Sequence, residues 1–366
     1  MKKKKFVISG INLFEGGTLS IYYDCLDALL FAGYDKKYDI TAFVHKESLF
    51  EKYKDRINII EIPKSRKSYI YRLYYEYIFF YRYSKKRKID IWLSIHDMTP
   101  NVKAKKRFVY CHNPSPFLKR SPTIKKLSKT VYYMSIFYKY VYRINIKKNT
   151  AVIVQQDWLR KEFKKMFGIK NIIVARPNVE VQIPENIDEY TRDNSKKVFI
   201  YSAYPRPFKN FEVICKACKA LKEYNDKFEV WLTVDGSENA YSDMLRKEFA
   251  DVKNIRWLGL VSRDEMMKKY AESDYLIFPS VLETWGLPIT EYEAFKKPML
   301  VADLPYAHET VGDYDKVLFF NPYSSDSLAG VMKRIIEEAA IFQKHTVPPL
   351  GKPVLNSWEE LLEMIL

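Results

Sequence analysis

The sequence predicts an α/β protein built from two doubly wound domains, and three observations lead to this prediction. The chain has 366 residues, too long for one ordinary core, and fits two domains of about 170–180 residues each. Hydrophobic residues make up 47% of the chain, enough to fill packed interiors. Short β-branched or aromatic runs alternate with helical patterns, as in βαβ units around parallel sheets. We expect the two domains to face each other across a cleft.

The N-terminal half begins with an apolar strand at 6–9, after the basic start Met1-Lys-Lys-Lys-Lys. This start resembles a signal peptide, but its apolar run is too short and no small-residue cleavage site follows. Gly16-Gly17-Thr18 then opens a helix over 19–31, where apolar residues recur at helical spacing. Further short runs predict strands at 39–44, 57–62, 89–95, 107–111 and 150–154.

The C-terminal half repeats this alternation, with Ser262 as the capping residue of one helix. Strands are predicted at 197–202, 228–234, 275–278, 298–302 and 317–320, and helices at 211–224, 264–272, 288–295 and 357–366. The polar run 185–197 is the predicted linker. The predicted domains are therefore 1–180 and 181–350, with 351–366 as a C-terminal helix that packs back on the N-terminal domain.

Charge is distributed unevenly between the two halves. Residues 1–180 hold 38 Lys and Arg against 15 Asp and Glu, whereas residues 181–366 hold 23 against 30. This asymmetry predicts that the N-terminal domain faces an anionic partner. Aromatic and basic residues interleave over 64–88 and 117–148, which suits nucleic acid, an anionic membrane surface, or a solvated basic surface over a tyrosine-rich core.

Cysteines and apolar runs restrict the class of protein further. Four cysteines in so long a chain do not form a disulfide framework, so we expect free thiols and a reducing cytoplasm. Two of them, Cys215 and Cys218, have the spacing of half a metal site, but no second pair exists and their helical apolar pattern indicates core packing. No window approaches the roughly 20 uninterrupted apolar residues of a membrane span.

The segment 280–291, Ser-Val-Leu-Glu-Thr-Trp-Gly-Leu-Pro-Ile-Thr-Glu, has the pattern of a phosphate-binding loop. It follows a predicted buried strand, and Pro288 stands where a first helical position is expected. A helix N-terminus presents unpaired amide hydrogens, which suit a diphosphate. Glu291, one turn into the helix, suits the vicinal hydroxyls of a ribose. Taken alone, two glutamates with seven residues between them also fit an exposed helix.

Several further motifs accompany this segment in order: Asn254–Gly259, Ala271–Ser280 and Lys297–Asp303. Together they resemble the retaining glycosyltransferases of family 4, which have the GT-B fold of two Rossmann-like domains. The resemblance is dense from about 197 to 321 and thinner before it.

The resemblance implies roles for residues of the C-terminal domain. It implies that Glu291 binds the ribose and that Glu283 contacts the donor sugar ring near its 3- and 4-hydroxyls. The implied basic pair is Lys209 and Arg206, whose fixed charges would stabilise the departing nucleoside diphosphate; their spacing is shorter than the usual family spacing, so Lys209 is the firmer of the two. The phosphates would meet the amides around Trp285, Gly286 and Leu287, and the base would lie near Leu260 and Val261.

The resemblance also implies roles for the N-terminal domain. Gly16-Gly17 matches the family's glycine-rich loop, where the backbone approaches the sugar or diphosphate closely. His112 would hydrogen-bond the donor sugar, and His96 and Asp97 are candidates to touch the acceptor. The family keeps the anomeric configuration without an evident protein nucleophile, and a phosphate oxygen takes the acceptor's proton. GT-B enzymes usually need no catalytic metal, so we interpret Asp313-Tyr-Asp315 as a surface loop.

The function implied is a retaining, metal-independent hexosyltransferase that takes a sugar from UDP or GDP and needs no other cofactor. The acceptor would be a lipid-diphosphate-linked or oligosaccharide chain in bacterial capsule, O-antigen or exopolysaccharide synthesis. Such acceptors favour an anionic membrane over nucleic acid as the partner of the basic half, and a cytoplasmic protein peripheral to the inner face of the membrane. The alternative is a catalytically silent GT-B subunit that binds a partner, against which Glu283, Glu291 and Lys209 argue.

Overall fold

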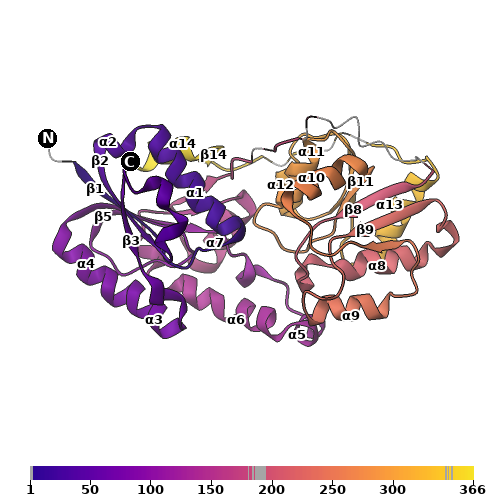
Figure 1. The fold of residues 1–366 in the computed structure, drawn as a ribbon, viewed down its shortest axis with the longest axis horizontal. Helices are drawn as coiled ribbons and strands as arrows, with labels where there is room; N and C mark the ends of the chain where they lie inside the picture. The colour runs from indigo at the N-terminus through magenta and orange to yellow at the C-terminus, as the bar shows by residue number, and fades with distance from the viewer. Residues whose placement is uncertain are drawn as a thin grey trace. The chain divides into compact units, whose positions relative to one another are not determined.

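The chain forms two compact units, each built around one parallel sheet (Figure 1). The computed structural model describes residues 3–179, 181–183, 185, 195–342, 344, 346–347 and 349–366. The first unit comprises Met1–Pro116, Phe137–Asn178 and Leu350–Leu366, and the second comprises Phe117–Ile136 and Val179–Pro349. Most of the predicted linker, 186–194, lies outside the described residues.

The first unit contains an eight-stranded sheet in the order β14-β7-β6-β5-β4-β1-β2-β3, in which every pairing is parallel. Its strands are β1 (Lys4–Gly10), β2 (Tyr38–Val44), β3 (Asn58–Glu61), β4 (Ile89–Ser94), β5 (Ala104–Cys111), β6 (Ala151–Val154), β7 (Ile172–Ala175) and β14 (Val354–Leu355). Since β1 pairs with β4 on one side and β2 on the other, the chain winds outward in both directions from β1.

Helices cover both faces of this sheet. The α-helices are α1 (Gly16–Phe31), α2 (Tyr34–Lys37), α3 (Tyr69–Tyr74), α4 (Phe80–Arg87), α7 (Asp157–Phe167) and α14 (Trp358–Ile365). A π-helical turn, η4 (Tyr75–Phe79), joins α3 to α4. The helix α6 (Lys129–Arg143) begins among residues of the second unit and ends in the first. Short 3₁₀ turns occur at Glu47–Leu49, Glu51–Tyr53, Pro63–Arg66, Ser115–Phe117 and Ile146–Lys148.

Alternation along the strands separates two apolar layers. Phe6 and Ile8 of β1 pack with residues of α1 and α14, whereas Val7 between them packs with Phe80 of α4 on the opposite face. The helix α14 completes the first layer, where the Trp358 ring stacks on Tyr110 of β5 with ring centroids 5.3 Å apart. This contact supports β5 immediately before the chain reaches His112.

The second unit contains a six-stranded parallel sheet in the order β10-β9-β8-β11-β12-β13. Its strands are β8 (Lys197–Tyr201), β9 (Phe228–Leu232), β10 (Ile255–Trp257), β11 (Tyr275–Phe278), β12 (Met299–Ala302) and β13 (Val317–Phe320). Its helices are α5 (Pro122–Leu127), α8 (Phe211–Ala220), α9 (Ala240–Glu248), α10 (Arg263–Glu272), α11 (Leu287–Glu293), α12 (Pro305–Val311) and α13 (Ser325–Ile336), with 3₁₀ turns at Pro207–Lys209 and Lys222–Tyr224.

The predicted strands all correspond to strands of the two sheets, which confirms the predicted fold class. Ser262 caps α10 as expected, since its side chain accepts a hydrogen bond from the Glu265 amide. The predicted helix 211–224 instead leaves the α-helical conformation after Ala220 and continues as a 3₁₀ turn. The strands β7, β10 and β14 were not predicted. β10 and β14 have only three and two residues, and β7 is buried throughout and shows no alternation.

Candidate functional site

Lys209 and Glu283 form an ion pair in the second unit, with Lys209 Nζ 2.5 Å from Glu283 Oε1. The two side chains are mostly buried, with 19% and 13% of their surfaces exposed. Each residue follows a central strand of the sheet: Lys209 lies in the segment after β8, and Glu283 lies in the segment after β11. Because β8 and β11 are parallel neighbours, their carboxyl ends bring these two segments together.

Hydrogen bonds hold the two segments against each other. The Val281 amide and the Ser280 hydroxyl both donate to the Phe208 carbonyl, at 2.8 and 3.2 Å. Asn210, in the left-handed region with φ of 60°, donates its side-chain amide to the carbonyls of Pro279 and Pro322. The Tyr201 hydroxyl donates to the Lys209 carbonyl at 2.8 Å. These contacts fix the backbone on both sides of the ion pair.

Arg206, the second predicted cation, contacts Tyr204 rather than the Lys209–Glu283 pair. Its side chain is exposed, and its guanidinium carbon lies 5.9 Å from the centre of the Tyr204 ring. The structure thus brings together Lys209 and Glu283 of the predicted set, while Arg206 packs on a neighbouring tyrosine.

Glu291 lies within α11 and is partly buried. Burial raises the pKa of its carboxyl above the ordinary value, and the Arg263 charge and a hydrogen bond with Tyr270 only partly oppose this. The Tyr270 hydroxyl lies 2.5 Å from the Ser202 hydroxyl, just after β8. Glu291 is therefore a carboxylate held at the same edge of the sheet as the segment that carries Lys209.

Gly286 is the N-cap residue of α11 and has a backbone conformation that favours glycine. Its φ is 95°, and an added Cβ would meet side-chain atoms of Ile289 and Phe278 at 3.3 Å. The neighbouring Trp285 is buried and donates its indole N–H to the Thr290 hydroxyl at 3.0 Å, whereas Leu287 is 40% exposed. The buried indole anchors the turn, and the chain reaches the surface at Leu287.

Leu260 and Val261 follow β10, where the predicted base would lie. Leu260 is 63% exposed and Val261 is half-buried. The preceding Gly259 has a φ of 73°, and an added Cβ would meet the Asp235 carboxylate at 2.9 Å. The turn thus requires glycine and leaves an apolar side chain uncovered beside it.

Gly16 and Gly17 form the first turn of α1, next to open space. Gly16 has a φ of 63°, and nothing lies within 4 Å of a Cβ added at either glycine. The N-cap residue Glu15 makes no side-chain capping hydrogen bond. The first amides of this 16-residue helix are therefore available to a ligand.

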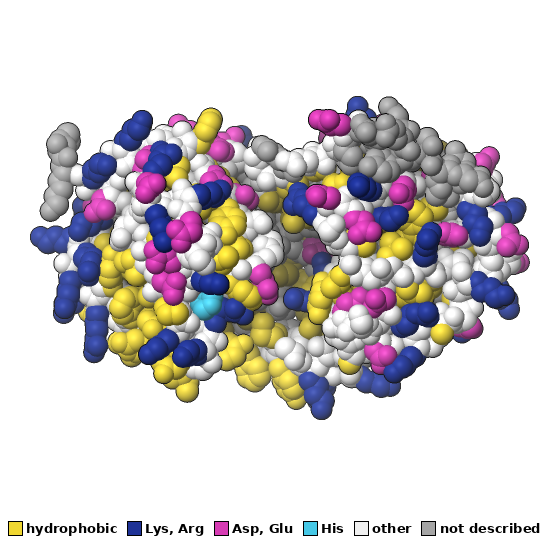
Figure 2. Space-filling view, in the orientation of Figure 1, with side chains coloured by type: hydrophobic (Ala, Val, Ile, Leu, Met, Phe, Trp, Pro, Cys, Tyr) yellow, Lys and Arg dark blue, Asp and Glu magenta, His cyan; other side chains and the backbone are white. Residues whose placement is uncertain are grey.

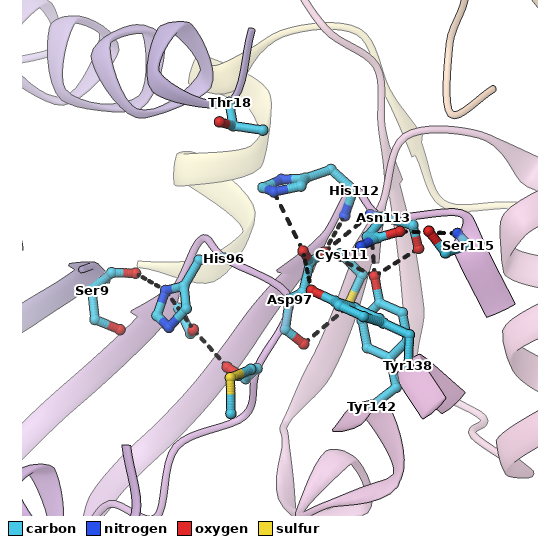
Figure 3. A network of polar contacts seen from close by, with 12 residues as sticks. Ser9, Thr18, His96, Asp97, Cys111, His112, Asn113, Ser115, Tyr138 and Tyr142 are labelled. Atoms are coloured by element: carbon cyan, nitrogen blue, oxygen red, sulfur yellow. Dashed lines mark hydrogen bonds and ion pairs between the residues drawn. The ribbon is translucent and has the colours of Figure 1, made fainter. Parts of the chain in front are cut away.

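Asp97 is the centre of a polar network in the first unit (Figure 3). It is 5% exposed and sits in the left-handed region, with φ of 71°. It accepts hydrogen bonds from two backbone amides and two tyrosine hydroxyls: His112 N at 2.7 Å, Asn113 N at 3.1 Å, Tyr142 at 2.8 Å and Tyr138 at 3.0 Å. The His112 ring nitrogen Nε2 lies 3.5 Å from Asp97 Oδ2.

His96 is completely buried and is held at both ring nitrogens. Its Nδ1 lies 2.7 Å from the Ser9 carbonyl oxygen, and its Nε2 lies 2.5 Å from Glu76 Oε1. Glu76 is also fully buried, on the π-helical turn η4. His96 was a candidate to touch the acceptor, but in this structure both its nitrogens bind protein atoms, so it acts as a tether between β4 and the π-helical turn.

Glu76, Tyr138 and Tyr142 are site residues that sequence reasoning missed. Glu76 is the single acidic residue between positions 62 and 89, inside a strongly basic and aromatic segment. A single acidic residue in such a segment could have indicated that its carboxylate has a partner within the protein. The two tyrosines are four residues apart on α6, the spacing of one helix face. Neither signal specifies the partner, because both contacts join distant segments.

Other candidates from the sequence lie outside these clusters. Asp313 and Asp315 are both exposed in the turn between α12 and β13. Cys215 and Cys218 are completely buried in α8. Within the described ranges, no group of three or more His, Cys, Asp or Glu side chains is arranged to hold a metal ion.

A surface of aromatic and basic side chains lies over α3, η4 and α4. Figure 2 shows hydrophobic side chains next to Lys and Arg side chains at this edge of the first unit, at the lower left. We call its apolar part the aromatic surface; its members are Tyr69, Ile70, Tyr71, Leu73, Tyr74 and Ile78, all at least 41% exposed. The exposed cations Arg82, Lys85, Lys86, Arg87 and Lys88 follow it in α4 and at its end. In the part of the chain that the structure describes, no helix has the length and apolarity needed to cross a bilayer.

Known proteins resemble this chain in sequence and in fold. Residues 182–346 match the family model described as glycosyl transferases group 1. The O-antigen chain mannosyltransferase RfbU of Salmonella typhimurium is 21% identical over 239 residues, which are 63% of this chain and 65% of RfbU. The chain thus covers slightly less than two thirds of that relative.

Among solved structures, sucrose-phosphate synthase from Thermosynechococcus elongatus has a TM-score of 0.67 at 12% identity, covering 92% of this chain and 90% of that one. Anabaena Alr3699/HepE in complex with UDP and glucose has a TM-score of 0.59 at 13% identity, covering 92% and 90%. At such low identity the likeness shows the fold alone, and the fold is GT-B.

Proposed function

We propose that this chain, whose residues 182–346 match the model of the group 1 glycosyl transferases, is a retaining, metal-independent glycosyltransferase with a nucleotide-sugar donor. The observation that carries the proposal is the mostly buried ion pair between Lys209 and Glu283, at the carboxyl ends of two neighbouring parallel strands. In doubly wound sheets, ligands bind outside these strand ends.

Lys209 supplies the charge that this reaction needs. When the glycosidic bond to the nucleoside diphosphate breaks, negative charge accumulates on the departing phosphate. Lys209 is already held by Glu283 and by the hydrogen bonds around its backbone, so its ammonium group stabilises that charge without reorganisation. Glu283 also presents carboxylate oxygens that accept hydrogen bonds from sugar hydroxyls.

Glu291 binds the nucleoside in this proposal. Its partly buried carboxylate accepts hydrogen bonds from the two ribose hydroxyls, while the exposed Leu260, with Val261, covers one face of the base. The amides around Gly286 meet the diphosphate, and Arg206 adds a second positive charge when its side chain leaves Tyr204.

We also propose substrate-binding roles for α1 and His112 of the first unit. The uncapped amides at Gly16 and Gly17 suit an anionic or hydroxyl-rich ligand, because nothing lies in the space that a side chain would occupy there. The His112 ring hydrogen-bonds a sugar hydroxyl. The acceptor hydroxyl attacks on the face that the diphosphate leaves, and a phosphate oxygen takes its proton, so the anomeric configuration is retained.

For the substrates, we propose a hexose carried on UDP or GDP, with mannose the first sugar to test because RfbU is named as a mannosyltransferase. The acceptor is a lipid-diphosphate-linked or oligosaccharide chain of a bacterial surface polysaccharide. We propose that the protein binds an anionic membrane from the cytoplasmic side. The aromatic surface and the cations of α4 support this proposal, because aromatic rings favour the membrane interface and cations favour anionic headgroups.

The decisive experiment measures nucleotide binding and turnover separately. Purified protein is screened for thermal stabilisation by UDP and GDP, since the correct nucleotide stabilises by RT ln(1 + [L]/Kd). Hydrolysis of UDP-glucose and GDP-mannose is then measured with EDTA present, for the wild type and for Glu283→Ala. Turnover that Glu283→Ala abolishes is the expected result. Stabilisation without turnover from any UDP- or GDP-sugar would favour a silent binding subunit instead.

A further inference from the structure

The Asp97 carboxylate accepts four hydrogen bonds within the protein. Four donors converge on its two carboxylate oxygens, from the backbone after β5 and from two tyrosines of α6. Burial works to raise the pKa of Asp97, but His112 and these hydrogen bonds hold it below its usual value. The carboxylate therefore remains ionised inside the protein.

The two nitrogens of the His112 ring are in different surroundings. Nε2 faces the Asp97 carboxylate at 3.5 Å. Nδ1 is buried and has no hydrogen-bond partner among the described residues. A neutral imidazole carries one proton, and a carboxylate beside Nε2 favours that proton on Nε2. Nδ1 then keeps its lone pair and can accept a hydrogen bond from a ligand.

We propose that Asp97 is a positioning residue that holds the proton of His112 on Nε2, so that Nδ1 accepts a hydrogen bond from a hydroxyl of the sugar substrate. This proposal rests on the proposed function, and it states which partner donates in the hydrogen bond between His112 and the sugar. It gives the buried ring nitrogen, which lacks a partner among the described residues, a hydrogen bond when the sugar binds.

Burial and the nearby positive groups favour a neutral His112 ring near pH 7. Burial lowers its pKa, the Asp97 carboxylate opposes this, and His96 and Arg72 lower it further. The other groups that face Asp97 and His112, Tyr138 and Tyr142 of α6 and Cys111 of β5, have pKa values raised well above their usual ranges, so they stay uncharged. Asp97 is thus the negative group that faces the His112 ring.

Further hydrogen bonds, made by the neighbouring His96 and by the Asp97 backbone, fix the position of Asp97. The preceding residue, His96, is tied at both ring nitrogens to Ser9 and Glu76. The Asp97 amide donates to the Tyr110 carbonyl at 3.2 Å, which links the turn to β5. These contacts hold Asp97 in the left-handed backbone conformation that turns its carboxylate toward His112 (Figure 3).

The test reads the tautomer directly by NMR of protein with ¹⁵N-labelled histidine, without ligand. The chain has five histidines, and the His112 signals are assigned by their loss in His112→Gln. In the wild type at pH 7.5 we expect a neutral ring with the proton on Nε2. In Asp97→Asn, whose amide nitrogen replaces the oxygen that faces Nε2, we expect the proton to move to Nδ1. A wild-type proton on Nδ1 would overturn the proposal, even if Asp97→Asn does not fold.

Kinetics provide a second readout that a purely structural role would not move. In Asp97→Asn we expect the plateau of kcat/KM to fall on the order of tenfold to a hundredfold, as for one lost hydrogen bond to a substrate. The loss of activity toward acid pH should shift to lower pH, because the carboxylate that raises the pKa of His112 is gone. An unmoved acid limb would contradict the proposal.

Asp157→Asn is the matched control. Asp157 is likewise a buried carboxylate of the first unit with two cation partners, Arg160 and Lys161. Its loss should lower stability without changing the His112 signals or the acid limb. If no nucleotide-sugar is turned over at all, the proposed function fails, whereas the tautomer measurement still decides the role of Asp97.

Discussion

Lys209 Nζ lies 2.5 Å from Glu283 Oε1 although 74 residues separate them in the chain. We expect Lys209→Met to lower kcat by about 10²–10³-fold, the usual effect of removing a group that stabilises developing negative charge. Binding of the nucleoside diphosphate should weaken less. Steady-state kinetics with the donor identified by the nucleotide screen measure both effects.

The control for this variant is Lys219→Met. Lys219 also pairs with a carboxylate of the second unit, Asp251, but at 3.9 Å and with both side chains more than half exposed. Such exposed pairs contribute little to stability, so kcat should not change. Full activity in Lys209→Met would remove the central role proposed for the pair.

Glu291→Gln should stabilise the ligand-free protein and weaken nucleotide binding. Burial raises the pKa of Glu291 in the folded protein, so its ionised form opposes folding. The penalty is absent at pH values below the ordinary glutamate pKa and appears as pH rises through the raised value. Melting temperatures at pH 4 and pH 8 should therefore differ between variant and wild type only at pH 8, with the variant higher.

The same variant should bind the nucleoside diphosphate about tenfold to a hundredfold more weakly, because hydrogen bonds to a charged group contribute about 1.5–3 kcal/mol. Calorimetric titration with the nucleoside diphosphate checks this. Unchanged affinity would show that the ribose lies elsewhere.

Ile70→Ser with Leu73→Ser should reduce binding to vesicles of anionic phospholipid by at least tenfold. These two residues of the aromatic surface are 78% and 44% exposed, and burying one such side chain fully contributes about 1.5–3 kcal/mol. Phe31→Ser is the control, since Phe31 is 89% exposed on α1, outside the aromatic surface. Co-sedimentation with vesicles measures the difference, and equal losses in both variants would contradict a specific membrane surface.

Neutralising four exposed cations of α4 and its end, Arg82, Lys85, Lys86 and Lys88, should weaken vesicle binding further at low salt. Each cation near an anionic surface contributes about 1 kcal/mol, so we expect a loss of at least a hundredfold. Nucleotide binding should be unchanged, because these cations belong to the first unit and the nucleotide site is proposed in the second. If the variant and the wild type sediment equally with anionic vesicles, the cations form a solvated basic surface that does not bind the membrane.

Trp358→Ala should destabilise the first unit by about 3–5 kcal/mol, as expected for a buried tryptophan. The ring is 5% exposed and stacks on Tyr110, two residues before His112. Urea unfolding of the whole chain, followed by circular dichroism, measures the loss. Met364→Ala, at a position of the same helix that is 47% exposed, should change stability little. A similar loss of stability in that variant would mean that the effect does not come from the Trp358 ring.

Most of the fold follows from the sequence, because strand and helix patterns are local. The runs that end at Ser9 and Cys111 predict strands correctly, and the motif around Glu283 is carried by a short continuous segment. The contacts of the site are not local. Nothing in the pattern around Lys209 specifies Glu283 as its partner, and nothing near Asp97 specifies Tyr142.

The missed elements have physical reasons too. The π-helical turn that buries Glu76 includes a contact with His96, twenty residues away, which local helix propensity does not encode. The aromatic residues on either side of it suggested a surface, and several of them do form one. The same segment therefore has an exposed apolar side and a buried polar side, which composition alone does not separate.

The first unit is assembled from chain segments on both sides of the second. The strand β14 and the helix α14 come after residue 349, yet Leu361 and Leu362 are completely buried against the layer of α1. A ribosome makes residues 179–349 before it makes these, so the unit that holds Lys209 and Glu283 has its whole sequence available first. The layer beneath Asp97 and His112 closes only when α14 emerges. Synthesis interrupted before α14 would therefore leave an intact Lys209–Glu283 pair in the second unit and an uncovered hydrophobic face in the first.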